Sequence, residues 1–295
     1  MTENIYVRKR KRRRRVAILG SVSLIGVTIM SLVAFLGRYV GQFTVSLDSG
    51  DVALALATKS DFSDATTYLR IDSLPAFEEW SYSYLPMDDY ANFTSSKLDS
   101  ESTDYLTGAN YNIDTQEVDS LNYFKYTFYL RNTGNYAADY TFRLNFTDNK
   151  LSSSGDSILD SMRIMLFASD VTEDSSSAST TSGTVYAHKS KTTKTIVDSS
   201  TNETITTDQE YISITPEEAT ETSPCYGLAT NFASDDMAFD LTVNEFEKGQ
   251  TMRYTIVTWL EGFDPEVDGI SASRLADASV KMGVSIDATQ SQQIQ

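Results

Sequence analysis

The chain of 295 residues contains a single cysteine, Cys225, and a single histidine, His188. A lone cysteine excludes a disulfide within the chain, and no residue beside Cys225 would activate its thiol. A lone histidine excludes zinc peptidase chemistry of the H-E-x-x-H type, which needs two histidines one helical turn apart. A serine–histidine–aspartate triad would have to use His188, and no G-x-S-x-G nucleophile turn lies near it. Hydrolysis by these two routes is therefore not expected.

Positive charge is scarce after residue 38. Residues 39–295 hold 15 basic and 40 acidic side chains, a net charge of −25, whereas the first 38 residues hold nine basic side chains and one acidic. A surface this acidic repels nucleic acid, so no nucleic-acid partner is expected. The eight consecutive basic residues Arg8–Arg15 could instead be a nuclear signal or a nucleic-acid arm, but their position before an apolar segment favours a topology signal.

Charged residues and proline are absent from the segment Val16–Leu36. At about 1.5 Å per residue, a helix of this length spans the roughly 30 Å hydrocarbon core of a bilayer. Basic residues beside such a helix stay on the cytoplasmic side. We therefore expect a cytoplasmic basic tail at 1–15, a transmembrane signal-anchor at 16–37 and an extracellular domain at 38–290. The expected protein is therefore a single-pass protein of the cell membrane, with the lipid bilayer as its first partner.

A cleaved signal peptide is the alternative to this anchor. The apolar segment is longer than the 7–15 residues of a usual signal core, and no A-x-A-like cleavage site follows it. Arg38, Tyr39 and Val40 stand where a signal peptidase needs small residues. The sequence favours an uncleaved anchor; cleavage would release a protein that begins near Tyr39.

Alternating apolar and polar residues predict several short strands after the anchor. The runs Phe124–Leu130 and Tyr136–Phe146 flank the turn Asn132–Asn135, a pattern typical of a β-hairpin. At 52–58 a helix is the alternative to a strand, and the continuous apolar run at 162–168 favours a central strand. The sequence predicts a mainly β fold, an antiparallel β-sandwich of the jelly-roll or immunoglobulin-like type preceded by one transmembrane helix. The other strands are expected at 43–47, 52–56, 237–243, 252–258 and 280–286.

Two irregular insertions interrupt the predicted sandwich. The first, at about 70–118, contains the aromatic cluster Trp80, Tyr82 and Tyr84. This cluster could bind carbohydrate, although covering one end of the sandwich is the simpler interpretation. The second, at about 170–215, is rich in serine and threonine, and this composition predicts an exposed β-hairpin or a partly disordered flap.

Three features together resemble the TasA–camelysin group of Gram-positive extracellular proteins. They are the apolar N-terminal segment, the turn Asn132-Thr-Gly-Asn-Tyr136 and the late strand and loop Trp259-Leu-Glu-Gly262. The resemblance covers the sandwich strands, about half of the chain. It implies a jelly-roll-like sandwich outside the cell that polymerises into biofilm matrix fibres by lending an N-terminal strand to a neighbour. An uncleaved anchor departs from that pattern, because the strand Phe43–Leu47 would stay tethered.

An acidic segment near the C-terminus is the one candidate metal site. In Asp264-Pro-Glu266-Val-Asp268-Gly, oxygen ligands alternate before a glycine, as in the first half of a calcium loop. Position twelve of such a loop is Leu275 here instead of glutamate, so a solvated acidic turn is the alternative. If calcium binds, we expect Asp264, Glu266 and Asp268 to be its ligands, with Glu261 assisting. No other cofactor is expected.

These observations predict a membrane-anchored, non-enzymatic surface protein that acts in adhesion, envelope organisation or biofilm matrix assembly. Its contacts, with itself or with other envelope or matrix proteins, are expected at exposed sheet edges by β-augmentation. The alternatives are a surface module that binds calcium or glycan and a cleaved, secreted fibre subunit. An envelope enzyme comes third.

Overall fold

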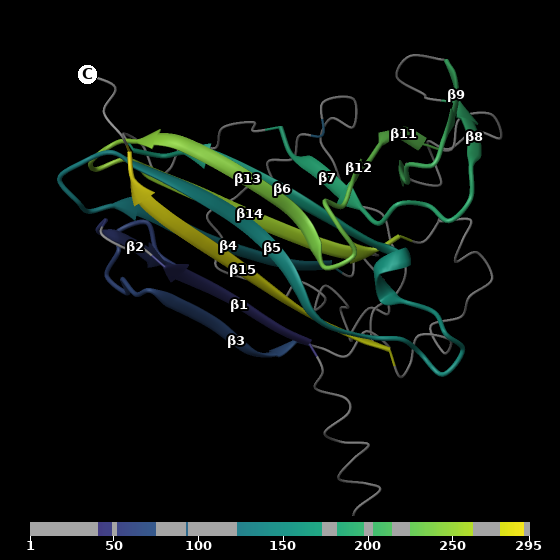
Figure 1. Cartoon of the computed structure of the whole chain (residues 1–295), viewed down its shortest axis with the longest axis horizontal. Coiled ribbons are helices and arrows are strands. Elements are labelled where there is room, and N and C mark those ends of the chain that lie inside the picture. Colours follow the sequence, from purple (N-terminus) through teal and green to yellow (C-terminus); the bar gives the residue numbers. More distant parts are fainter. Residues whose placement is uncertain are drawn as a thin grey trace, which may run out of the picture. The chain divides into compact units, whose positions relative to one another are not determined.

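The computed structural model describes residues 41–48, 52–74, 93, 123–172, 182–197, 203–213, 225–261 and 278–291. All of them belong to one compact unit, Gly41–Gln295. These residues form strands, joined by loops and by one turn of 3₁₀ helix (Figure 1). The chain is thus mainly β in the part that the structure describes.

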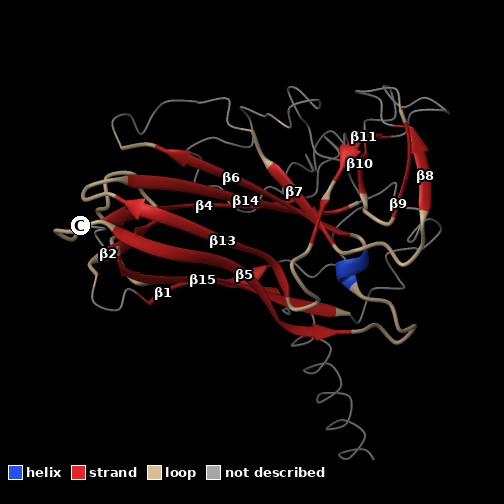
Figure 2. Ribbon diagram, turned by 45° about the horizontal axis from the view of Figure 1, so that its top comes forward, coloured by secondary structure: helices blue, strands red, loops and turns tan. Residues whose placement is uncertain are grey.

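The strands build two larger sheets, which contain both parallel and antiparallel pairs (Figure 2). The five-stranded sheet has the order β13 (Met237–Phe246), β5 (Ala138–Lys150), β15 (Ser279–Gln290), β1 (Gly41–Asp48) and β3 (Tyr68–Leu74). The six-stranded sheet has the order β12 (Thr230–Asn231), β7 (Thr184–Ala187), β6 (Met162–Asp170), β14 (Thr251–Leu260), β4 (Tyr123–Asn132) and β2 (Leu54–Ala57). Two small sheets pair β8 (Lys194–Val197) with β9 (Thr204–Thr207) and β10 (Tyr211–Ser213) with β11 (Cys225–Leu228).

One apolar core lies between the two larger sheets. Along β5, buried and half-buried residues alternate from Ala138 to Phe146, so one face of the strand points into the core. The Phe142 ring stacks on the Tyr254 ring of the opposite sheet, with centroids 4.5 Å apart, and lies 6.2 Å from Phe128. Each fully buried side chain of this size contributes about 1.5–3 kcal/mol, so this layer of rings holds the sheets face to face.

The six-stranded sheet is buried on both faces. In β6, Ile164 and Leu166 join the core between the sheets, whereas Met165 and Phe167 belong to a second apolar cluster on the other face. Trp259 of β14 lies in this second cluster as well. The predicted central position of 162–168 is confirmed, because both faces of that strand need apolar side chains.

The predicted hairpin around Asn132–Asn135 is wrong. β4 belongs to the six-stranded sheet and β5 to the five-stranded sheet, so the turn carries the chain across the core. The turn 247–250 does the same between β13 and β14, and so does the connection from β1 to β2. Alternation shows only that each strand has one apolar face, and two such faces can meet across a core as well as lie side by side in one sheet.

The prediction of an antiparallel sandwich holds only in part, because the two larger sheets are mixed. β1 runs parallel to β15, with Phe43 opposite Met282 and Leu47 opposite Ile286. β12 runs parallel to β7. Parallel neighbours need a long connection, and almost the whole domain separates β1 from β15. Strand direction therefore depends on the path of the chain, which local patterns do not reveal.

The remaining local predictions have mixed outcomes. Residues 54–57 form strand β2, so the helix considered at 52–58 is excluded. In the second insertion, β8 and β9 form the expected hairpin, but β7 is a buried strand of the six-stranded sheet. The first insertion begins as strand β3 at 68–74. The cluster Trp80, Tyr82 and Tyr84 lies outside the described residues, as do the segments 1–15 and 16–37. No helix of the described ranges is long and apolar enough to cross a membrane.

Candidate functional site

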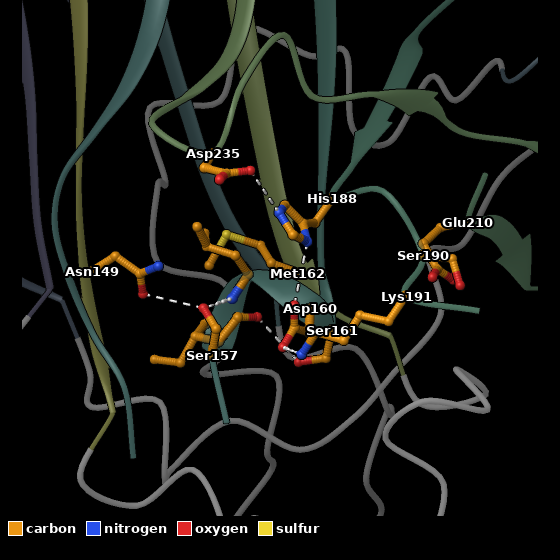
Figure 3. Close-up of polar contacts among 12 residues, drawn as sticks. Asn149, Ser157, Asp160, Ser161, Met162, His188, Ser190, Lys191, Glu210 and Asp235 are labelled. Atoms are coloured by element: carbon orange, nitrogen blue, oxygen red, sulfur yellow. Dashed lines mark hydrogen bonds and ion pairs between the residues drawn. The ribbon is translucent and has the colours of Figure 1, made fainter. Parts of the chain in front are cut away.

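His188 lies in a group of charged side chains that includes Asp160, Lys191 and Asp235 (Figure 3). It follows the last residue of β7. Its Nδ1 lies 3.3 Å from Oδ1 of Asp160, and its Nε2 lies 3.4 Å from Oδ1 of Asp235. The imidazole is thus held between two carboxylates from different parts of the chain.

Local structure explains how the two carboxylates reach His188. Asp160 ends the 3₁₀ helix η2 (Ile158–Asp160), which begins where the Ser157 hydroxyl accepts a hydrogen bond from the main-chain N–H of Leu159. Ile158 and Leu159 are buried in the core, so the helix is anchored and its last residue turns toward His188. Asp235 lies in the turn between β12 and β13, in which Ser234 pairs with Met237.

The charges in this cluster shift one another's pKa. Burial alone would raise the pKa of Asp160, but its contacts with His188 and Lys191 outweigh burial and the pKa is lowered. The contact with Asp160 raises the pKa of His188 above its ordinary value of 6.5, against the effect of burial, and the hydrogen bond to Asp235 raises it further. The contacts therefore favour a carboxylate at Asp160 and an imidazolium at His188.

A buried ion pair lies beside this cluster, on the second apolar face of the six-stranded sheet. Arg163 Nη2 of β6 lies 3.1 Å from Glu210 Oε2, and both side chains are almost fully buried, with 0% and 1% exposed. Next to β6, the indole N–H of Trp259 donates to Glu261 Oε2 at 3.3 Å. Glu261, the expected assistant in calcium binding, is buried, and its carboxylate accepts this hydrogen bond from Trp259.

A carboxylate that accepts a hydrogen bond from Nδ1 can orient a catalytic histidine and leave Nε2 to act on a nucleophile. Asp160 lies 3.3 Å from Nδ1 but without hydrogen-bond geometry. Here Nε2 faces the Asp235 carboxylate. In the described part of the chain, no serine, threonine or cysteine bonds to Nε2. This arrangement supports charge pairing better than it supports acyl transfer.

The expected calcium ligands Asp264, Glu266 and Asp268 lie outside the described residues. Within the described ranges, no three histidine, cysteine, aspartate or glutamate side chains lie close enough together to hold a metal ion. Sequence reasoning missed Asp160 and Asp235, because it placed His188 in a polar flap. The apolar Val185–Ala187 run directly before His188 was the available signal that a buried strand ends there.

The terminal strands of the two larger sheets are the second candidate functional feature. β12 has two residues and β2 has four, and Leu56 of β2 forms a β-bridge with Thr66. β13 departs from regular pairing at both ends, and Glu245 there has a φ of 56°. Short or bulged strands offer poor templates for another strand. β3 has seven residues and one register shift, opposite Gly41–Phe43, and its pairing with β1 is continuous from Phe43 to Ser46.

Comparison of the chain with protein-family models, curated proteins and solved structures found no match. The likeness to the TasA–camelysin group therefore remains an expectation drawn from the residues that carry it.

Proposed function

We propose that this chain is a membrane-anchored, non-enzymatic surface protein that acts in adhesion, envelope organisation or matrix assembly. The observation that carries this proposal is the edge strand β3, which ends the five-stranded sheet and lies beside β1, the first strand after the apolar segment. A strand of a second copy, or of another envelope protein, can extend the sheet at this edge by main-chain hydrogen bonds.

The register of β3 supports this use of its edge. The main-chain N–H of Leu47 donates to the C=O of Thr67 at 3.0 Å, so this opposed pair is hydrogen-bonded. Hydrogen-bonded and non-bonded pairs alternate along an antiparallel ladder. Arg70, opposite Thr44, falls in the non-bonded class, so its main-chain groups point away from β1. The side chains of Tyr68 and Arg70 are exposed on the sheet face.

The position of β1 supports anchoring near the membrane. Four residues, 37–40, separate the apolar segment from Gly41, and a fully extended chain of that length spans about 14 Å. Phe43 and Val45 of β1 are fully buried. The β domain thus follows the apolar segment directly in the sequence, as expected of a domain tethered by a short linker.

We also propose that the two facing sheets form a sandwich of the jelly-roll type. Three short connections support this: β1 to β2, β4 to β5 and β13 to β14 each join strands of different sheets. Successive strands that alternate between two sheets are typical of such folds.

The substitution Arg70→Pro is expected to weaken association at the β3 edge by about tenfold, the effect of losing about 1.4 kcal/mol. Proline removes the outward N–H and is tolerated on edge strands, so the fold should persist. The measurement is chemical cross-linking of the full-length protein on intact cells, together with cell clumping. Arg70→Ala, which keeps the N–H, is the control. Equal loss in both variants would show that the side chain, and not the strand edge, makes the contact.

The full-length protein is expected to stay in the membrane fraction after an alkaline wash, with an intact mass near 32.8 kDa. Its β domain should be digested by protease added outside intact cells. Ile25→Arg places a charge at the centre of the apolar segment, at a cost of about 2.5–3.5 kcal/mol, and should reduce membrane retention. A soluble product that begins near Tyr39 would contradict the anchor. It would favour the cleaved fibre subunit, because cleavage would free β1 to pair with a neighbouring copy.

A further inference from the structure

We propose that His188 links the two larger sheets only when its imidazole is protonated, and we call this link the His188 clasp. Its imidazolium binds Asp160 and Asp235 at the same time, and deprotonation releases the turn that leads into β13. This inference does not depend on the anchoring or assembly role proposed above.

The position of the three residues makes His188 a link between the sheets. His188 follows β7 of the six-stranded sheet. Asp160 lies on η2, in the connection from β5 of the five-stranded sheet to β6 of the six-stranded sheet. Asp235 precedes β13, the edge strand of the five-stranded sheet. Figure 3 shows the ring between the two carboxylates, with one nitrogen directed at each.

The chemistry of imidazole makes this link depend on protonation. Neutral imidazole carries one N–H, and its other nitrogen presents a lone pair; the imidazolium carries two N–H donors. Both ring nitrogens here face a carboxylate. The neutral ring can therefore donate to only one of them, and the other carboxylate then faces a lone pair.

Burial decides which carboxylate is released. Asp160 is 9% exposed and is also bonded to Lys191, so it stays in place. The Asp235 side chain is 97% exposed and gains full hydration when it swings away. The contact of Nε2 with Asp235 has hydrogen-bond geometry, whereas that of Nδ1 with Asp160 is a charge contact at 3.3 Å without it. An unpaired buried charge nevertheless costs more than an exposed one. The remaining N–H therefore stays on Nδ1 beside the buried carboxylate, and the turn at 233–236 loses its contact.

The other groups around the ring do not replace the lost donor. Phe232 packs against the ring, with centroids 6.1 Å apart. Lys191 binds the far oxygen of Asp160, and Lys189 pairs with Asp208 at 2.7 Å. On the neighbouring strand, Arg163 is paired with Glu210. None of the contacts that the structure shows for these cations reaches Asp235.

The sign of the pH dependence follows from the raised pKa of His188. A histidine whose pKa is higher in the folded than in the unfolded chain contributes stability that is fully present below pH 6.5, its unfolded value. That contribution is lost as the pH rises through the folded pKa. The clasp is therefore closed in mildly acidic medium and open in alkaline medium.

Two measurements on the full-length protein in detergent test the clasp. His188 is the only histidine, so the NMR signal of selectively labelled histidine reports its titration without assignment. We expect a pKa above 6.5 in the wild type and a lower pKa in Asp235→Asn. Between pH 6 and pH 8.5, amide exchange at Ala233, Ser234 and Met237, corrected for the intrinsic effect of pH, should accelerate by about tenfold in the wild type. These amides bond within the turn and to the start of β13.

Matched variants make the test specific. Asp235→Asn keeps the size of an exposed side chain but loses its charge: the amide oxygen can accept a hydrogen bond from the imidazolium but forms no ion pair with it. Exchange in the turn should therefore be faster than in the wild type at pH 6 and should change less between the two pH values. Asp236→Asn changes the adjacent carboxylate, which does not contact His188, and should behave like the wild type. A wild-type pKa at or below 6.5, or the same pH response in Asp235→Asn as in the wild type, would overturn the clasp.

Discussion

Replacing Asn132 by alanine is expected to destabilise the β domain by about 3 kcal/mol. The Asn132 side chain is 1% exposed and makes three hydrogen bonds. Its Nδ2 donates to the C=O of Tyr136 at 2.9 Å and of Phe246 at 2.8 Å, and its Oδ1 accepts from the N–H of Gly134 at 2.9 Å. Each such bond contributes about 1 kcal/mol, and alanine leaves all three main-chain partners without it.

The large effect reflects the place of Asn132 in the fold. Its side chain fixes the turn from β4 to β5 and the end of β13, while its main chain bonds to Gly249 and Gln250 in the turn from β13 to β14. These two turns are crossings between the sheets. Their loss would loosen the end of the domain opposite to His188. Arg131 lies opposite Thr251 at the start of β14. His188 follows Ala187, which pairs with Arg163 opposite Trp259 near the end of β14.

Thermal unfolding followed by tryptophan fluorescence measures this effect, and a fall of about 6–12 °C in melting temperature is expected. Asn135→Ala is the control from the same turn, since Asn135 is exposed and only accepts a hydrogen bond from Lys248. It should cost less than about 0.5 kcal/mol. Asn132→Asp keeps the shape but directs oxygen at two carbonyls, so it should destabilise at least as much as alanine. A tolerated Asn132→Asp would contradict the hydrogen-bond argument.

Replacing Glu210 by alanine is expected to cost about 3–5 kcal/mol. Its carboxylate lies 3.1 Å from the guanidinium of Arg163, in a region where neither side chain reaches water. The Arg163 guanidinium is fully desolvated. Removing this carboxylate takes away favourable charge pairing while the cost of burying the cation stays, so breaking such a pair is more damaging than replacing both of its charges. Urea unfolding of the full-length protein in detergent measures the loss.

Two further variants separate charge from packing. Lys189→Ala breaks the nearby pair with Asp208, which is 2.7 Å long but exposed, and should cost less than about 1 kcal/mol. The double variant Arg163→Met with Glu210→Leu removes both charges and should recover most of the stability. If the double variant is as unstable as Glu210→Ala, lost packing and not the uncompensated charge explains the effect.

Several local features of the described domain could be predicted from the sequence, because they depend on residues that are neighbours in the chain. Alternation along 138–146 and 280–286 placed strands correctly, since one face of each must be apolar to be buried. The continuous apolar run at 162–168 predicted a strand covered on both faces, and β6 is one. The mainly β class follows from these patterns. The expectations for 16–37 and for Asp264, Glu266 and Asp268 concern residues outside the described ranges and stay predictions.

Tertiary structure alone decided how the strands are arranged and which charges meet. Asn132-Thr-Gly-Asn has the composition of a hairpin turn, yet it crosses between sheets, because apolar faces can pair across a core as well as along an edge. His188 stands in a polar sequence, but the connection through η2 and the turn before β13 bring Asp160 and Asp235 to its two nitrogens. These residues are 28 and 47 positions away from His188 in the sequence. Local patterns record which face of a strand avoids water; they carry no information about which distant carboxylate will face a given ring.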